Sequence, residues 1–144
     1  MLILCTGMFT GMASAGPTDL VDIRTYQWKN RLLFLFAPSE EDPSYRLLRK
    51  EIDRQAKGVE DRDLLVFHIL EKGVSRLGTE PLSSAQVLSL KKHLSAFPGK
   101  FMIILIGKDG GGKLRQDRLV DLKEIFGIID AMPMRQQEMR ERTK

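Results

Sequence analysis

The sequence predicts an α/β domain with a mixed sheet, and three observations support this. Short apolar runs bounded by turn residues recur along the chain, amphipathic helical segments separate the first three runs, and a glycine-rich turn follows the third. Uninterrupted apolar runs are typical of strands buried on both faces. Strands joined by a helix are expected to be parallel, whereas strands joined by a tight turn are antiparallel.

Four segments carry the strand pattern, at residues 31–37, 63–70, 101–106 and 113–117. The first reads Arg-Leu-Leu-Phe-Leu-Phe-Ala and stops at Pro38. The last two are separated by Lys-Asp-Gly-Gly-Gly, in which Asp-Gly is a strong hairpin signal.

Three helices are predicted, at 43–57, from Ser83 or Ser84 to about 96, and at 121–132. Asp42 as N-cap and Pro43 as the first helical residue begin the first helix, and Gly58 is expected to end it. Its buried stripe is Tyr45, Leu48, Ile52 and Ala56. The combined order, β-α-β-α-β-β-α, predicts a thioredoxin-like fold.

The N-terminus predicts export. Residues 1–15 are apolar and uncharged and end in Ala-Ser-Ala, which is typical of a signal peptide cleaved after Ala15. We expect a lead-in at 16–30, a thioredoxin-like domain at 31–132 and a basic C-terminal tail at 133–144. The mature protein would be periplasmic or secreted, without a transmembrane segment.

The cysteine count excludes thiol redox chemistry in the mature chain. Cys5 is the only cysteine and would leave with the signal peptide. The net charge of +4 is carried entirely by residues after position 15. This balance suggests anionic partners, but it is mild, and a solvated basic surface with no ligand explains it better.

Three carboxylates, Glu40, Glu41 and Asp42, occupy the helix N-terminus at which thioredoxin-like enzymes hold their thiol. Helix capping explains them. The alternative is a cysteine-independent enzyme that uses these acids together with the loop at 97–100.

Other chemical signals are weak, and we expect no cofactor and no metal site. Gly107 to Lys113 resembles a phosphate-binding loop but lacks the following Ser or Thr and helix, so we interpret it as a hairpin turn. His68 lies in an apolar strand, and His93 lies beside two lysines on a helix. Neither has a ligand partner at metal-binding spacing.

The first helix presents a basic outer face in which Arg46, Lys50 and Arg54 form a candidate surface for an anion or a partner. An anionic envelope polymer or another envelope protein would fit this surface. Nucleic acid is disfavoured because the protein is predicted to be exported and its few aromatic residues are predicted to be buried. The tail adds further cations and could dock on a partner.

Four segments resemble the domain of unknown function 4174 family of short exported bacterial proteins: Trp28–Leu33, Phe36–Ser39, Leu105–Gly111 and Ile129–Met139. That family is similar to domains of animal sushi-repeat and Equarin-type matrix proteins. The resemblance implies a peroxiredoxin-related, thioredoxin-like fold without redox cysteines. It implies no activity and no catalytic residue.

The leading hypothesis is therefore a non-catalytic binding or interaction module in the cell envelope. The carboxylate enzyme is one alternative. The other is a structural envelope protein that docks through its tail from Met132 onward.

Overall fold

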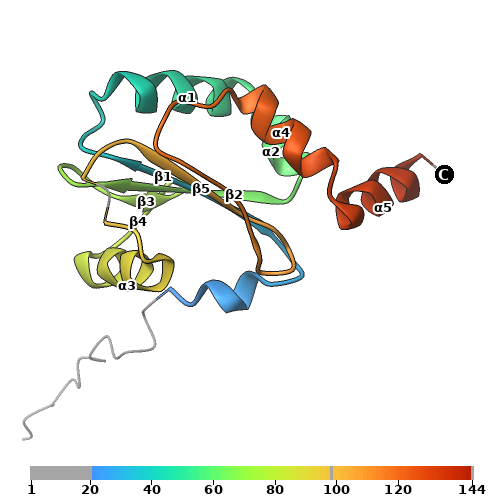
Figure 1. Cartoon of the computed structure of the whole chain (residues 1–144), viewed down its shortest axis with the longest axis horizontal. Helices are drawn as coiled ribbons and strands as arrows, with labels where there is room; N and C mark the ends of the chain where they lie inside the picture. The colour runs from blue at the N-terminus through green and yellow to red at the C-terminus, as the bar shows by residue number, and fades with distance from the viewer. Residues whose placement is uncertain (1–20, 98, 144) are drawn as a thin grey trace, which may run out of the picture.

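One six-stranded sheet organises the protein (Figure 1). The computed structural model describes residues 21–143 except Pro98, so the predicted signal peptide with Cys5 and its cleavage site lies outside the described residues. The sheet order is β4-β3-β2-β1-β5-β6. The strands are β1 (Arg31–Ala37), β2 (Leu64–Leu70), β3 (Arg76–Leu77), β4 (Glu80–Pro81), β5 (Met102–Ile106) and β6 (Gly112–Gln116).

The pairing confirms the predicted mixed sheet. β1 is parallel to β2 and antiparallel to β5, and β5 and β6 form the expected antiparallel hairpin, with a bulge between Leu105 and Ile106. The central order β2-β1-β5-β6 is that of a thioredoxin-like core. The four predicted strand segments did not include β3 and β4, which extend the sheet beyond β2. Strands of two residues are too short to leave a periodic signal.

Helices cover both faces of the sheet. Figure 1 shows α1, α2 and α4 on one face and α3 with the 3₁₀ helix η2 on the other, while α5 lies beyond one end of the sheet. The helices are η2 (Ile23–Tyr26), α1 (Pro43–Arg54), α2 (Ala56–Asp61), α3 (Ser84–Leu94), α4 (Leu122–Asp130) and α5 (Pro133–Arg142).

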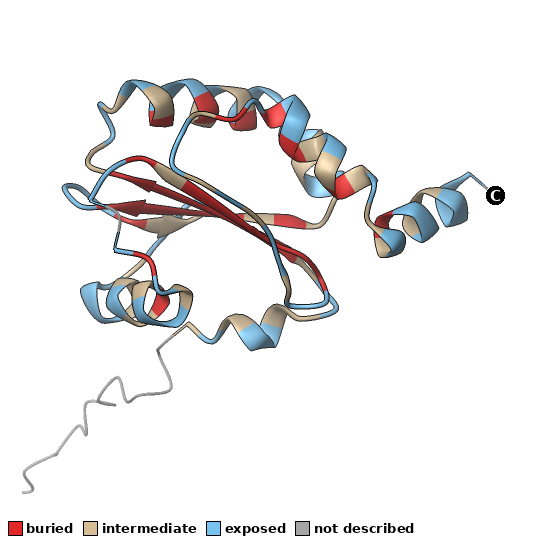
Figure 2. Cartoon of the chain, viewed as in Figure 1, coloured by how far each residue is buried: buried red, intermediate tan, exposed pale blue. Residues whose placement is uncertain are grey.

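The core is divided by β1, whose seven residues are all buried (Figure 2). Alternate side chains of a strand point to opposite faces. Leu33 and Leu35 therefore pack under α1 and α4, whereas Leu32, Phe34 and Phe36 pack toward α3. A strand buried on both faces explains why the sequence shows a continuous apolar run rather than an alternating one.

The first helix begins as predicted but ends differently. The Asp42 carboxylate accepts a hydrogen bond from the Tyr45 backbone N–H at 2.9 Å, a cap worth about 1 kcal/mol. The helix breaks at Gln55, and Gly58 lies inside α2 instead of ending the helix. A Cβ at Gly58 would lie 2.9 Å from the ring of Phe126, so this glycine lets α4 approach closely. After the break Ala56 is exposed, contrary to the predicted stripe.

Candidate functional site

A thioredoxin-like enzyme would hold its thiol at the end of the sheet where β1 stops and the chain enters α1. Residues 37–43 read Ala-Pro-Ser-Glu-Glu-Asp-Pro and contain no cysteine. Asp42 caps α1, and Glu40 lies 3.5 Å from Arg76. Two of the three predicted acids therefore have structural partners, while Glu41 is exposed.

Of the loop at 97–100, the described residues Phe97, Gly99 and Lys100 precede β5 and lie at the same end of the sheet, because β5 is antiparallel to β1. Phe97 is exposed, and the Lys100 ammonium pairs with Asp117 at 2.9 Å. The lysine is thus engaged with the segment after β6 rather than with the acids before α1.

The predicted anion surface lies along one exposed face of α1, with Arg46, Lys50 and Arg54 one helical turn apart. Arg54 pairs with Glu51 at 2.9 Å. Arg46 and Lys50 border a shallow hollow of about 520 Å³, whose rim also carries the acids Glu40, Glu41 and Asp53. The surface is therefore mixed in charge and exposed to solvent.

Beneath this surface lies a buried pair, Tyr45 and His68, which we call the Tyr–His pair. The Tyr45 hydroxyl and His68 Nδ1 are 2.8 Å apart, and the two rings meet edge to face at 5.7 Å. Tyr45 is 0% exposed and His68 is 4% exposed. The first turn of α1 supplies the tyrosine, and the middle of β2 supplies the histidine. The buried Tyr45 hydroxyl and His68 Nδ1 therefore satisfy each other, as buried polar atoms require.

Two arginines flank the Tyr–His pair. Arg49 lies one helical turn beyond the tyrosine on α1, and Arg76 on β3 stands opposite the histidine in the β2–β3 register. Both arginines form long ion pairs: Arg49 lies 4.0 Å from Asp53, and Arg76 lies 3.5 Å from Glu40. Both ion pairs are looser than the charge-assisted hydrogen bonds typical of a tight pair.

The electrostatics keep the histidine neutral. The pKa of His68 is lowered from 6.5 to about 3, mainly by burial, with smaller contributions in the same direction from the charges of Arg76 and Arg49. Burial raises the pKa of Tyr45, an effect that the two guanidinium groups partly offset. At neutral pH the pair therefore consists of a neutral phenol and a neutral imidazole between two cations.

A groove of about 430 Å³ opens beside the histidine, between α1, α2 and the β2–β3 edge. His68 and Arg76 are its basic groups, and Asp53 and Thr79 also line it. The other lining side chains are mainly apolar, among them Ile52, Val59 and Leu77.

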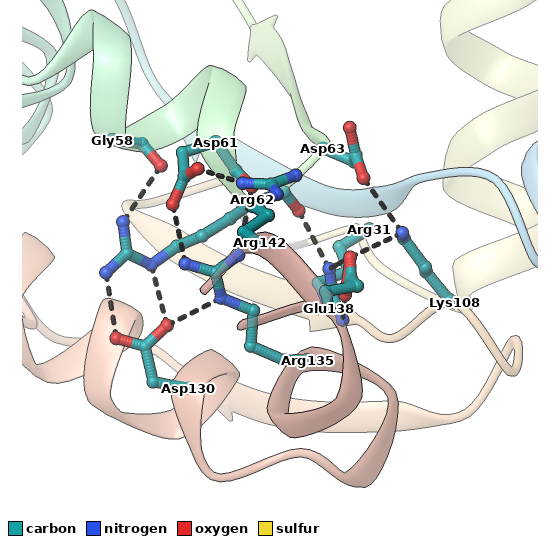
Figure 3. Close-up of polar contacts among 10 residues, drawn as sticks. All are labelled: Arg31, Gly58, Asp61, Arg62, Asp63, Lys108, Asp130, Arg135, Glu138 and Arg142. Carbon is teal, nitrogen blue, oxygen red and sulfur yellow. Dashed lines mark hydrogen bonds and ion pairs between the residues drawn. The ribbon is translucent and has the colours of Figure 1, made fainter. Parts of the chain in front are cut away.

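A second cluster, at the opposite end of β1, holds α5 on the domain (Figure 3). Arg31 is 0% exposed, and its guanidinium donates to Glu138 at 2.7 and 3.2 Å and to the Arg62 carbonyl at 2.9 Å. Lys108 donates to Glu138 at 2.7 Å and to Asp63 at 2.8 Å. Arg31 Nε has no hydrogen-bond partner within the described part of the chain.

The same network continues toward α4 (Figure 3). Arg62 donates to both carboxylate oxygens of Asp130, at 3.0 and 2.8 Å. Arg135 is buried and donates to Asp130 at 3.0 Å and to Asp61 at 2.6 Å. Arg142 also pairs with Asp61. We call the residues of Figure 3 the α5 network.

The α5 network gives a structural role to two of the resembling segments. Lys108 of Gly-Lys-Asp-Gly meets Glu138, and Asp130 and Arg135 of Ile-Asp-Ala-Met-Pro-Met-Arg meet each other. The stretch predicted as a basic tail thus forms helix α5, whose only buried residue is Arg135. Its attachment rests mainly on charge pairs.

Sequence reasoning missed both clusters. It treated Arg31 as the edge of an apolar run and His68 as an isolated core residue, because partners distant in sequence leave no periodic signal. One available signal was the charge of Arg31 at the start of a fully buried strand, since a buried cation requires a counter-charge. No group of three or more possible metal-ligating side chains occurs in the described ranges.

The model of the domain of unknown function DUF4174 family matches residues 22–138. The chain belongs to this family. It is 29% identical over 141 residues to zebrafish (Danio rerio) coiled-coil domain-containing protein 80, covering 88% of this chain and 16% of that protein. It is 28% identical to human sushi repeat-containing protein SRPX, covering 94% of this chain and 29% of that protein. The DUF4174 chain thus spans less than a third of these relatives.

Solved structures confirm the thioredoxin-like fold. A reduced Plasmodium vivax 2-Cys peroxiredoxin is similar with a TM-score of 0.56 at 15% identity, over 81% of the DUF4174 chain and 85% of the other. Plasmodium yoelii thioredoxin peroxidase I is similar with a TM-score of 0.56 at 14% identity, over 81% and 80% of the two chains. Within residues 21–143, Pro98 aside, the DUF4174 chain has no helix long and apolar enough to cross a membrane.

The α5 network predicts a large effect from a nearly isosteric change. Glu138→Gln leaves the buried charges of Arg31 and Lys108 without their shared carboxylate, so we expect the free energy of unfolding to fall by about 3 kcal/mol. Chemical denaturation at neutral pH measures this. The control, Glu141→Gln on the exposed side of α5, should change it by less than about 0.5 kcal/mol. Equal effects of the two variants would contradict the network.

The Tyr–His pair predicts a loss of stability in acid. The unfolded chain protonates His68 near pH 6.5, whereas the folded chain does so only near pH 3. Between these pH values the unfolded state binds one more proton than the folded state. The contribution of neutral His68 to the free energy of unfolding is therefore complete above pH 6.5 and is lost as the pH falls toward 3. Its slope approaches about 1.4 kcal/mol per pH unit.

Denaturation midpoints measured from pH 7 to pH 5 test this, with His68→Gln as the matched variant. The denaturation midpoint of the variant should change less between pH 7 and pH 5 than that of the unmodified chain, whatever the variant's stability at neutral pH. This range avoids Glu138, whose burial opposes ionisation but whose pKa the Arg31 and Lys108 contacts lower from 4.5 to about 2. Parallel curves for the two proteins would refute the buried neutral histidine.

Proposed function

We propose that the protein is a non-catalytic binding module of the cell envelope, and that it binds anionic partners on the α1 side of the sheet. The observation that carries this proposal is the chemistry of the edge between β1 and α1. A cysteine is absent there, Asp42 caps the helix, Glu40 has only a loose ion pair with Arg76, and Glu41 is exposed. An acid that caps a helix is poorly placed to serve as nucleophile or general base, and the other two acids face solvent.

The cationic side chains around that edge support an anionic partner. Arg46, Lys50 and Arg54 are exposed on α1, and Arg49 and Arg76 lie behind them with only loose ion pairs. Exposed cations on one face raise the local concentration of anions. An anionic envelope polymer is the partner that we favour over another envelope protein, because the basic side chains are spread along a helix rather than gathered around an apolar patch.

The envelope location rests on the N-terminal sequence. An apolar, uncharged stretch ending in Ala-Ser-Ala supports export, with cleavage after Ala15 and release of a periplasmic or secreted protein without cysteine. N-terminal sequencing of the protein recovered from its host should begin at Gly16. Recovery of the intact leader would contradict export.

Binding to soluble polyanions across a salt series tests the function. We expect the chain to bind a polyuronate or a polyphosphate at low ionic strength and to release it as salt screens the exposed charges. Reversing three charges, with Arg46→Glu, Lys50→Glu and Arg54→Glu, should weaken binding roughly tenfold or more, because each exposed pair contributes up to about 1 kcal/mol.

A control of equal net charge separates the α1 surface from overall attraction. It carries Glu at three exposed cations elsewhere, namely Lys92 on α3, Arg118 before α4 and Lys123 on α4. This control should bind nearly as well as the unmodified chain. An equal loss in both triple variants, or no binding at low salt, would contradict the proposed surface.

A further inference from the structure

The groove beside His68 combines an apolar wall with two hydrogen-bond donors. Ile52, Val59 and Leu77 contribute apolar surface from α1, α2 and β3. Arg76 and His68 contribute the polar groups at the β2–β3 edge, where they stand opposite each other in register. Side chains directly opposite on neighbouring antiparallel strands lie on one face of the sheet, so one ligand atom can meet both.

The Tyr–His pair determines which proton His68 presents. Arg49 and Arg76 flank the pair, and because a guanidinium can only donate, the phenolic proton of Tyr45 is directed away from them. We therefore assign the phenol as the donor in its 2.8 Å contact with His68 Nδ1. A neutral imidazole with an accepting Nδ1 carries its own proton on Nε2. Nε2 has no other hydrogen bond in the described structure and is available to donate to a ligand in the groove.

Arg76 has guanidinium N–H donors that Glu40 does not contact and that can bind the same ligand. Its contact with Glu40 is a single one, from Nη1 at 3.5 Å, and its side chain is 23% exposed. A guanidinium offers five N–H donors and binds a carboxylate through two of them. Asp53 also lines the groove and carries the opposite sign, so a ligand with several negative charges is disfavoured.

We infer that this groove binds a small alkyl carboxylate, with the carboxylate on Arg76 and His68 and the hydrocarbon chain along Ile52, Val59 and Leu77. The inference rests on the proposed function as a binding module and names one ligand class for it. A single carboxylate matches the guanidinium N–H groups of Arg76 that Glu40 does not contact and one imidazole N–H. A short hydrocarbon chain matches the apolar wall, and burial of each methylene adds about 0.8 kcal/mol.

Amide chemical shifts of the full chain, followed by NMR at constant pH and ionic strength, test the site. Hexanoate is the probe, and acetate and hexan-1-ol are matched ligands that lack the chain and the charge. Hexanoate should produce saturable shifts on β2 and β3 and bind at least about tenfold more tightly than either matched ligand. This comparison requires no variant to fold. Absence of saturation with hexanoate, or equal binding of all three, overturns the inference.

Two variants locate the carboxylate. Arg76→Gln should weaken hexanoate binding about tenfold or more, whereas Lys92→Gln on α3, on the opposite face of the sheet, should leave it unchanged. Unchanged binding in Arg76→Gln overturns the assignment. Failure of hexanoate with retained polyanion binding rejects the groove alone, and failure of both rejects the proposed function as well.

Discussion

A full positive charge lies buried at the start of the central strand, and much of the architecture follows from that placement. Arg31 opens β1, all of whose residues are buried, so its guanidinium cannot be solvated. Removing the counter-charge of a buried cation is strongly destabilising. Here the counter-charge is Glu138, 107 residues further along the chain. The central strand and the last helix are therefore coupled, and α5 is part of the folded domain although it buries little apolar surface.

The two ends of β1 make different kinds of contact. At its beginning, charge pairs hold α5, Lys108 and the β5–β6 turn together. At its other end the chain turns into α1 through residues that cap the helix. The layer beneath that turn contains the Tyr–His pair, flanked by Arg49 and Arg76. At the end of β1 where thioredoxin-like enzymes hold their thiol, this chain thus has a capped helix start and, beneath it, a buried Tyr–His pair between two arginines.

Local sequence signals were sufficient for the central elements and insufficient for both clusters. The buried strands and the Asp42–Pro43 helix start were predictable, because apolar runs and capping residues act on their neighbours. Gly58 was misread because its role depends on Phe126, which is distant in sequence. Likewise, the pairing of His68 with Arg76 depends on the register of a strand only two residues long. Contacts set by tertiary register leave no pattern in a single sequence.

The central claim is that anions bind on the α1 side of the sheet, and locating a bound anion tests it most directly. Crystals of the chain soaked in bromide would reveal each occupied anion site by anomalous scattering. The account predicts a bromide ion in contact with Arg76 or Arg49, beside the Tyr–His pair. Bromide bound only at cations on other surfaces, such as those of α3, would contradict it.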